Sequence, residues 1–152
     1  MLATMRTIAA SSVIFAPIDR VWSVLSDFDK YPEWSPFLVK IDGEVSVGTM
    51  LTLHVVMRAG QKPLTQRERV SMREEGREVR WGTVMGPPLL LKAERFQRLT
   101  AISATETRYE TADDFEGALV PLVFALYRAN IQAGFDATAI ALKTRCEQLK
   151  LG

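Results

Sequence analysis

Several acidic side chains of this sequence stand in strand-like segments that are otherwise apolar, where a carboxyl group could move protons. From residue 64 to residue 73 the residue types alternate, which places Gln66, Glu68 and Val70 on one face and arginines on the other. A carboxyl group on an apolar face loses hydration, which raises its pKa and leaves a protonated acid able to donate a hydrogen bond or a proton. Glu68 is therefore a candidate acid or base, with Gln66 and Val70 as candidate ligand contacts. Two alternatives stay open: an ion pair between Glu68 and a neighbouring arginine, or a bulge that turns Glu68 outward.

The register of the following strand decides which side chains lie beside Glu68. Glu75-Gly76 is typical of a tight turn between antiparallel strands. Counting outward from this turn sets each residue of one strand against a residue of the other, and it places Glu68 near an indole. The expected pairs are Met72 with Val79, Val70 with Trp81, and Glu68 with Thr83, so that Trp81 and Thr83 become candidate ligand contacts.

Further candidates lie in two later strand-like segments. If Phe96 faces inward, alternation places Glu94 on the same face. Asp113 shares a face with Tyr109, whose hydroxyl could hold the polar end of a ligand or reach water while the ring packs. We expect Glu94 and Asp113 to be further candidate acids or bases, with Tyr109 orienting the ligand and Phe96 and Thr111 in contact with it. The arginines of this region are expected mostly on the outer face, paired with glutamates: Arg67, Arg69, Arg73, Arg77, Arg80, Arg95 and Arg98.

Helical and strand-like patterns predict the elements that position these side chains. Pro17 suits the first position of a short helix, and a second short helical turn ends at Trp34. After Gly117 the chain shows an amphipathic helical pattern of about eight turns. The remaining segments are strand-like: the first is rich in Ile, Val, Thr and Ser, and from residue 37 onward the pattern has a period of two, as in antiparallel strands. These segments are residues 6–15, 37–41, 51–57, 64–73, a return strand from 79, and roughly 89–99 and 104–115.

Composition and charge exclude several classes of function. The 152 residues suit a single domain spanning 1–152, and nineteen basic against eighteen acidic residues give a net charge of +1, so no nucleic-acid partner is expected. Cys146 is the only cysteine and His54 the only histidine, so we expect no metal site and no cofactor. No apolar run approaches the roughly twenty residues that span a bilayer, so no stable membrane insertion is expected. Residues 1–7 contain no apolar signal-peptide core, which favours a cytoplasmic location.

The order of elements and a few motifs resemble a known superfamily. The motifs are Ala16-Pro17, Val21-Trp22, Leu25, Asp27-Phe28, Tyr31 and Trp34 near the start, Phe115-x-Gly117 before the last helix, and Ala141-Leu142-Lys143 near its end. Together they are similar to the START-related superfamily, often called SRPBCC, that includes polyketide cyclases/dehydrases and birch-pollen-allergen-like proteins. Relatives often carry a histidine in an H-x-F pattern where this chain has Glu94-Arg95-Phe96, which weakens any role carried over from that histidine.

The resemblance implies an α+β helix-grip fold. A curved antiparallel sheet of about seven strands would wrap round the long C-terminal helix, with two short helices after the first strand. An apolar cavity would lie between sheet and helix. The other residues expected to line it are Trp34, Leu53, Val55, Tyr127, Ile131 and Phe135.

Three functions fit these expectations. The first is binding of a small hydrophobic molecule, such as a lipid, quinone, polyketide or aromatic metabolite, in the cavity without catalysis. The second is a cyclase or dehydratase in which Glu68, Glu94 or Asp113 acts as acid or base and Tyr109 orients the substrate. The third is an accessory role through a protein partner, and a homodimer is also compatible with the sequence. Fold alone does not choose among them.

Overall fold

The computed structural model describes residues 5–86 and 90–149. Within them the predicted order of elements is confirmed: a strand, two short helices, an antiparallel sheet and a long last helix. The sequence also predicts that Gly86-Pro87-Pro88 interrupts the sheet, because proline has no backbone N–H to donate, but Pro87 and Pro88 lie outside the described residues. The elements are β1 (Met5–Ile14), α1 (Ile18–Ser26), the 3-10 helix η1 (Phe28–Glu33), β2 (Leu38–Asp42), β3 (Met50–Val55), β4 (Leu64–Glu74), β5 (Glu78–Met85), β6 (Leu91–Ser103), β7 (Glu106–Glu116) and α2 (Val120–Leu149).

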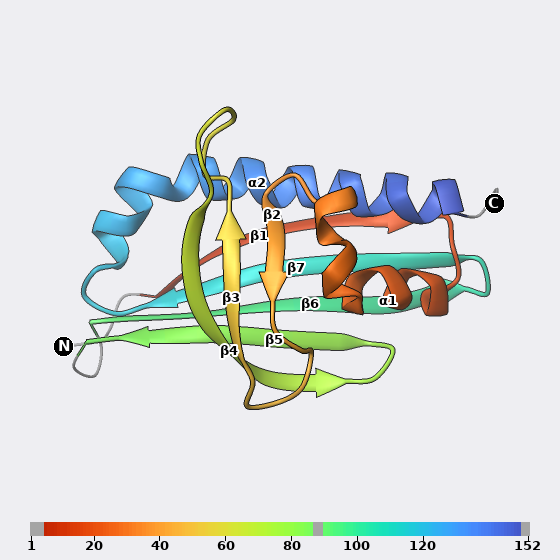
Figure 1. Cartoon of the computed structure of the whole chain (residues 1–152), viewed down its shortest axis with the longest axis horizontal. Helices are drawn as coiled ribbons and strands as arrows, with labels where there is room; N and C mark the ends of the chain where they lie inside the picture. Colours follow the sequence, from red (N-terminus) through yellow and green to blue (C-terminus); the bar gives the residue numbers. More distant parts are fainter. Residues whose placement is uncertain (1–4, 87–89, 150–152) are drawn as a thin grey trace.

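All the strands form one antiparallel sheet, in the order β1-β7-β6-β5-β4-β3-β2. The sheet is strongly curved: β1, β5, β6 and β7 follow the long axis of the molecule, whereas β2 and β3 run across it (Figure 1). This curvature gives the sheet a concave face, and α2 lies along the molecule beside β1. The architecture is the helix-grip fold that the sequence predicted.

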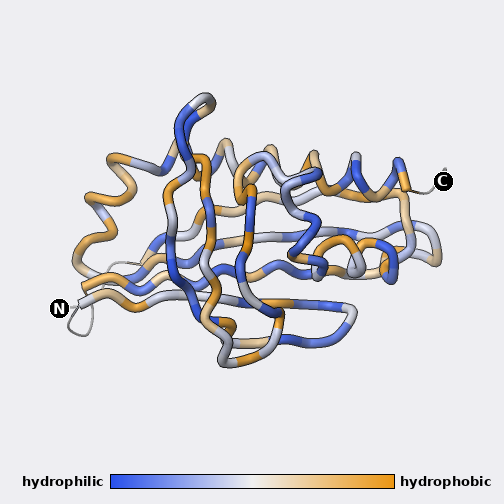
Figure 2. The backbone as a smooth tube through the Cα atoms, in the orientation of Figure 1, coloured by the Kyte–Doolittle hydropathy of each residue, from blue (hydrophilic) through white to orange (hydrophobic). Residues whose placement is uncertain are grey.

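Helix α2 packs a stripe of apolar side chains against the sheet. Phe124, Ile131, Phe135, Leu142 and Cys146 are buried along it. The beginning of α2 consists mostly of hydrophobic residues (Figure 2), and two of them, Leu122 and Leu126, are exposed.

Side chains of α2 also bond the backbone of β1. Gln132 Nε2 donates to the carbonyl oxygen of Ala9 at 2.8 Å, and Lys143 Nζ donates to that of Val13 at 2.9 Å. A carboxylate oxygen of Glu147 accepts a hydrogen bond from the backbone N–H of Phe15 at 2.9 Å. The helix is therefore held to β1 by polar contacts as well as by apolar packing.

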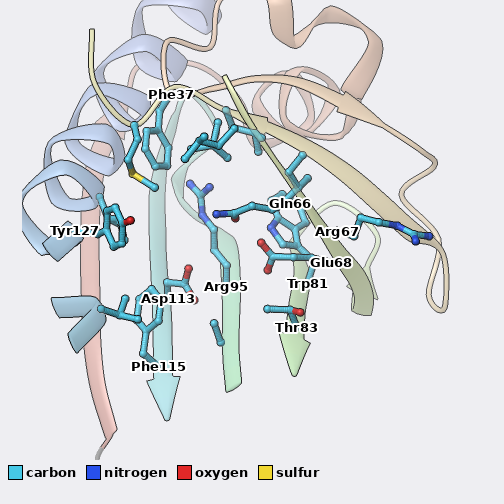
Figure 3. A pocket seen from close by; sticks show the side chains of 18 of the residues that line it. Phe37, Gln66, Arg67, Glu68, Trp81, Thr83, Arg95, Asp113, Phe115 and Tyr127 are labelled. Carbon is cyan, nitrogen blue, oxygen red and sulfur yellow. The ribbon is translucent and has the colours of Figure 1, made fainter. Parts of the chain in front are cut away.

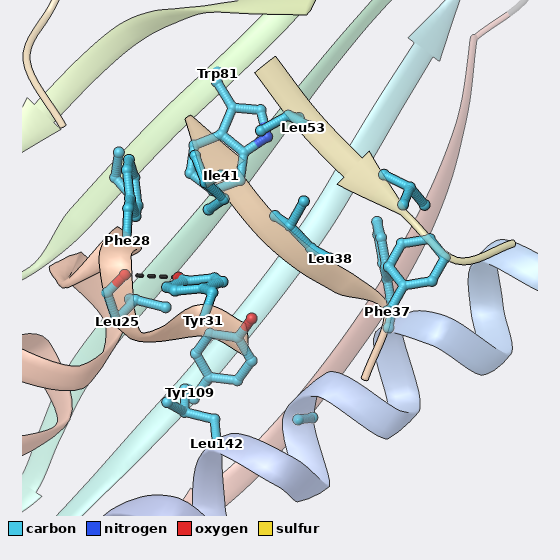
Figure 4. Packing of buried hydrophobic residues seen from close by; sticks show 14 of the residues in the cluster. Leu25, Phe28, Tyr31, Phe37, Leu38, Ile41, Leu53, Trp81, Tyr109 and Leu142 are labelled. Atoms are coloured by element: carbon cyan, nitrogen blue, oxygen red, sulfur yellow. Dashed lines mark hydrogen bonds between the residues drawn. The ribbon is translucent and has the colours of Figure 1, made fainter. Parts of the chain in front are cut away.

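The short helices bury an aromatic cluster under the sheet. Pro17 precedes the first residue of α1 and its carbonyl accepts from Arg20 N, so it stands one position earlier than expected. Phe28 meets Tyr31 and Trp81 edge-to-face, with ring centroids 5.6 and 5.9 Å apart. The Tyr31 hydroxyl donates to the carbonyl of Leu25 at 2.6 Å (Figure 4). These contacts fix the turn between α1 and β2 and position Trp81 in the core.

The register of β4 and β5 confirms one predicted pair and corrects another. Val70 pairs with Trp81 as expected, but Met72 pairs with Arg80 instead of Val79. The physical reason is the turn: pairing begins at Glu74 with Glu78, so the turn holds three residues where two were expected. A bulge between Val70 and Met72 then adds a residue to β4 and restores the predicted pair of Val70 with Trp81. The bulge lies beyond Val70, so Glu68 remains on the buried side of the strand.

The orientation of β6 is opposite to the prediction. Ala93, Arg95, Gln97 and Leu99 are buried, so Glu94 and Phe96 lie on the outer face and not in the cavity. Arginines cover the Phe96 ring: the guanidinium carbons of Arg80 and Arg98 lie 5.8 and 4.3 Å from its centroid. The Phe96 ring is thus half-buried by the stems and charged ends of these arginines rather than by the core. The same reversal brings Arg95, predicted to face outward, into the interior.

No helix within residues 5–86 and 90–149 has the length and apolar character needed to cross a membrane.

Candidate ligand-binding cavity

A cavity of about 550 Å³ lies between the concave face of the sheet and α2. Its wall is formed mostly by apolar side chains from β2, β3, β5, β7 and α2, together with Phe37 immediately before β2 (Figure 3). The volume lies within the range of about 300–1,000 Å³ typical of small-molecule sites. Apolar residues of the wall include Phe37, Leu38, Leu53, Val55, Met57, Trp81, Phe115, Val123, Ile131 and Phe135.

The cavity is lined from the concave face of the sheet on one side and from α2 on the other. On the α2 side, Phe37 and Phe135 pack edge-to-face with centroids 5.8 Å apart. Tyr127, about two helical turns nearer the start of α2 than Phe135, is 40% exposed and lies at the rim. The wall is therefore closed by aromatic packing at one end and more open at the other.

Arg95 is the central polar side chain of the cavity. It is only 5% exposed, and its Nε donates to Thr111 Oγ1 at 3.0 Å. Its guanidinium carbon lies 4.2 Å from the centroid of Phe135 and 5.9 Å from that of Trp81, which is cation–π geometry for a buried charge. One terminal nitrogen, Nη2, has no hydrogen-bond partner among the described residues. Arg95 therefore presents a free donor edge inside an apolar wall.

Two carboxyl groups accompany this guanidinium. Asp113 stands directly opposite Arg95 in the register of β6 and β7, and Glu68 reaches the same space from β4. Figure 3 shows Arg95 between them. Burial raises the pKa of Glu68 to about 7, with Arg95 acting in the opposite direction. Burial, followed by the nearby Glu68 charge, raises the pKa of Asp113 to about 8.

This arrangement supports proton exchange near neutral pH. Glu68 and Asp113 repel each other when both are ionised. Once one of the two carboxyl groups has released its proton, the other therefore holds its own proton more tightly. A carboxyl pair of this kind can donate a hydrogen bond when protonated and accept one when ionised. The cavity thus has an apolar wall and one polar centre whose charge depends on pH.

The structure places most of the candidate ligand contacts in the wall of the cavity. Thr83 lies near Glu68 as the register suggested, and Tyr127 lies at the rim. The candidates found in the wall are Leu53, Val55, Gln66, Glu68, Trp81, Thr83, Asp113, Tyr127, Ile131 and Phe135.

The other candidates lie outside the wall, each for a structural reason. The Tyr109 hydroxyl donates to Gln97 Oε1 at 2.7 Å inside the core. Val70 is fully buried, and Trp34 packs on Tyr31 with ring centroids 4.7 Å apart. Thr111 lies behind Arg95 and holds it in place.

Glu94 and Phe96 belong to the outer face, where Ser71 Oγ donates to Glu94 Oε1 at 2.6 Å. Among the acid–base candidates, Glu68 and Asp113 are brought together in the cavity, whereas Glu94 and Tyr109 are not.

Arg95 is the residue that sequence reasoning missed. Its orientation was inferred from a single aromatic residue, Phe96. The alternation of the whole strand carried the correct answer, because Leu91, Ala93 and Leu99 place the apolar side on the odd positions. Counting every apolar position of β6 would have assigned Arg95 to the cavity.

Comparison with known proteins gives one family and a set of similar folds. The family described as "Polyketide cyclase / dehydrase and lipid transport" matches residues 5–147. No curated protein matches the sequence.

Three solved structures with 17% to 21% sequence identity to the chain establish the fold. The Zhui aromatase/cyclase from Streptomyces sp. R1128 has 21% identity and a TM-score of 0.76 over 95% of both chains. A norcoclaurine synthase point mutant from Thalictrum flavum, in complex with a transition-state analogue, has 17% identity and a TM-score of 0.73 over 99% of both chains. A START superfamily protein from Mycobacterium smegmatis has 21% identity and a TM-score of 0.67, covering 94% of this chain and 98% of the other.

Proposed function

The chain belongs to the polyketide cyclase/dehydrase and lipid transport family, and on this basis we propose that it binds a small, mostly apolar molecule in the cavity between its sheet and α2, without converting it. The observation that carries the proposal is the cavity itself. Its volume of about 550 Å³ and its mostly apolar wall match a ligand of drug or lipid-chain size. A cytoplasmic location and a homodimer remain predictions from the sequence.

The energetics of such a site favour an apolar ligand. Each Å² of apolar ligand surface removed from water contributes about 25 cal/mol before the cost of immobilising the ligand. Trp81, Phe135 and Phe37 offer wide, rigid surfaces that lose little side-chain entropy on binding. Little conformational entropy of these side chains is therefore lost when a ligand packs against them.

Native mass spectrometry of freshly purified protein, followed by extraction and identification of any bound molecule, tests the proposal directly. Titration with Nile red, a neutral apolar fluorophore, tests it on protein without a carried ligand. Ile131→Trp would fill the cavity from α2, where Ile131 is 8% exposed, and should weaken Nile red binding at least about tenfold.

Ile140→Trp is the matched control, because Ile140 lies on the same helix and is 64% exposed. This variant should bind Nile red as the native protein does. A native protein that carries no ligand and binds no Nile red would contradict the proposal, as would equal binding by Ile131→Trp.

Acid–base catalysis of cyclisation or dehydration is the second candidate function, favoured by one specific observation. Glu68 and Asp113 both line the cavity and have pKa values raised to about 7 and about 8, so one can donate and the other accept a proton near neutral pH. The Zhui protein, with the same fold, is an aromatase/cyclase.

Glu68→Gln separates the two functions. For a binding protein this variant should leave Nile red affinity within about twofold, and no turnover of a bound molecule should be seen in the native protein. For an enzyme it should lower turnover by about 100-fold or more. Product formation from an extracted ligand by the native protein, lost in Glu68→Gln, would favour catalysis.

A further inference from the structure

The free donor edge of Arg95 restricts the chemistry of the ligand. Nη2 is buried in the cavity wall without a hydrogen-bond partner among the described residues, while Nε is occupied by Thr111. A buried donor of a charged group that stays unpaired is costly, more so than a neutral one. Asp113 Oδ1 is likewise buried and lacks a partner in the described part of the chain. Arg95 and Asp113 are paired in the register of β6 and β7, so the two unsatisfied polar atoms belong to side chains of directly neighbouring residues.

From this geometry we infer that the ligand bound in the cavity carries a single carboxylate, which accepts hydrogen bonds from Arg95 Nη2 and from the protonated carboxyl group of Asp113, with its apolar body against Trp81 and Phe135. The inference rests on the proposed binding function and names the class of ligand. A neutral apolar ligand could not accept these hydrogen bonds, so the desolvated guanidinium of Arg95 would stay unpaired beside it. An apolar molecule with a carboxylate resolves both problems at once.

The surroundings of Arg95 favour one negative charge and not two. A guanidinium with Nε already engaged has one edge left for a carboxylate. Glu68 and Asp113 stand on either side of it (Figure 3), so a dianionic phosphate would bring its second charge toward carboxyl groups. Stacking of the guanidinium against the rings of Phe135 and Trp81 holds it in the cavity wall, where Nη2 has no hydrogen-bond partner among the described residues.

Binding of a carboxylate must couple to protons. At neutral pH the charge of Arg95 is offset in part by the ionised fraction of Glu68. An incoming carboxylate takes over this role and repels a negative charge on Glu68 or Asp113, so the pair takes up protons from solvent as the ligand binds. Affinity should therefore fall as the pH rises through the range in which the pair ionises.

The other charged groups near this centre do not reverse that expectation. On β4, Arg67 lies at the rim and its side chain points away from the cavity. Glu94 on β6 and Asp114 on β7 add to the negative potential at Asp113 and keep its proton bound. On α2, Tyr127 is the titratable residue of the wall, and β5 contributes Trp81 and Thr83, which carry no charge.

A matched pair of probes tests the inference. 2-Naphthoate and 2-naphthalenemethanol have the same aromatic body and differ in the carboxylate. Isothermal titration calorimetry at about pH 6.5 should show that the native protein binds the carboxylate on the order of 10- to 100-fold more tightly than the alcohol. Between about pH 6.5 and pH 9 the affinity for the carboxylate should fall at least about fivefold, while that for the alcohol stays nearly constant. Titrations in buffers of different ionisation enthalpy should show proton uptake with the carboxylate.

Variants of β6 and β7 assign the effect to the proposed atoms. Arg95→Gln should remove the preference for the carboxylate while the alcohol still binds. Arg98→Gln, which removes a guanidinium from the outer face of the same strand, should keep the preference. Asp113→Asn keeps a hydrogen-bond donor and should bind the carboxylate with a weaker dependence on pH, and it serves as a second test if Arg95→Gln fails to fold.

The outcomes separate this inference from the proposed function. If the alcohol binds as tightly as the carboxylate, the binding function stands and the carboxylate inference is overturned. The same holds if the preference survives in Arg95→Gln or no protons are taken up. If neither probe binds and Nile red does not bind, the proposed function fails and the inference fails with it.

Discussion

Gly134 of α2 lies against the ring of Phe37, so close that a β-carbon added at residue 134 would stand 2.1 Å from Phe37 Cδ1. The contact lets the helix approach the segment before β2, and it places the Phe37 ring edge-to-face on Phe135 in the cavity wall. Glycine within a helix costs about 1 kcal/mol relative to alanine. Here this cost is offset by the close approach.

Gly134→Ala should therefore destabilise the protein, although the same change in an open helix would stabilise it. The Phe37 ring is buried and must shift, which we expect to lower the free energy of unfolding by about 1–3 kcal/mol and to weaken Nile red binding. Ala133→Gly, at the exposed neighbouring position, is the control and should cost about 1 kcal/mol with unchanged Nile red binding. Urea unfolding of both variants checks this, and a more stable Gly134→Ala would contradict it.

Asp113→Asn should make stability less dependent on pH. The pKa of Asp113 in the folded protein, about 8, lies above its ordinary value of 3.8, so the folded state keeps a proton that the unfolded chain releases between these pH values. Stability from this proton is present at low pH and lost as the pH rises toward 8.

For the native protein we therefore expect the free energy of unfolding to fall by on the order of 3 kcal/mol between about pH 5 and pH 8.5, with a smaller fall in Asp113→Asn. Urea unfolding at a series of pH values measures this. Parallel curves for the two proteins would show that Asp113 is ionised in the fold.

Glu78 on the outer face should contribute stability of the opposite pH dependence. Burial raises its pKa, but hydrogen bonds from Arg98 and Arg80 outweigh burial and hold the pKa below its ordinary value. The stabilisation is present above about pH 4.5 and is lost as the pH falls through the lowered pKa.

Glu78→Gln should cost about 1–3 kcal/mol at neutral pH, because its side chain is only 7% exposed and two guanidinium groups would lose their carboxylate. Glu74→Gln is the control, since the Glu74–Arg77 pair is mostly exposed and 4.0 Å apart, and it should cost less than about 0.5 kcal/mol. An equal loss of unfolding free energy in the two variants would contradict the prediction that burial makes the ion pairs of Glu78 more stabilising.

Tyr109→Phe should change stability and leave binding unchanged. The hydroxyl donates to Gln97 Oε1 in the core, outside the cavity wall, so its removal leaves a buried acceptor unpaired. We expect a loss of about 1–2 kcal/mol in urea unfolding and Nile red affinity within about twofold of the native value. A large loss of affinity would restore Tyr109 as a ligand contact.

The fold was predictable from local patterns, because apolar residues recur with a different period in helices and in strands, and glycine or proline marks the ends of several elements. Alternation in β3, β4 and β7 and the helical stripe of α2 are properties of neighbouring residues, and the structure confirms them. What neighbouring residues do not encode is the bulge between Val70 and Met72, which depends on how two strands fit.

The candidate site was predictable only in part. Glu68 and Asp113 followed from the alternation of their own strands. Arg95 did not, because Phe96 was taken as the inward residue although arginine stems can cover an aromatic ring on the outer face as well. The meeting of Glu68 with Arg95 also requires the curvature of the sheet, since β5 separates their strands. Local sequence patterns predict neither the size of the cavity nor the proximity of Glu68 and Arg95.

The polar contacts between α2 and β1 bear on whether the edge of the sheet at β1 can pair with a strand of another molecule. β1 and β2 are the edges of the sheet, and an open edge can template the addition of a strand from another molecule. Gln132, Lys143 and Glu147 engage backbone groups at Ala9, Val13 and Phe15, so positions on which an intruding strand would depend are already occupied. The opposite edge, β2, is short and irregular in its pairing with β3. These features disfavour the addition of a strand from another molecule at either edge of the sheet.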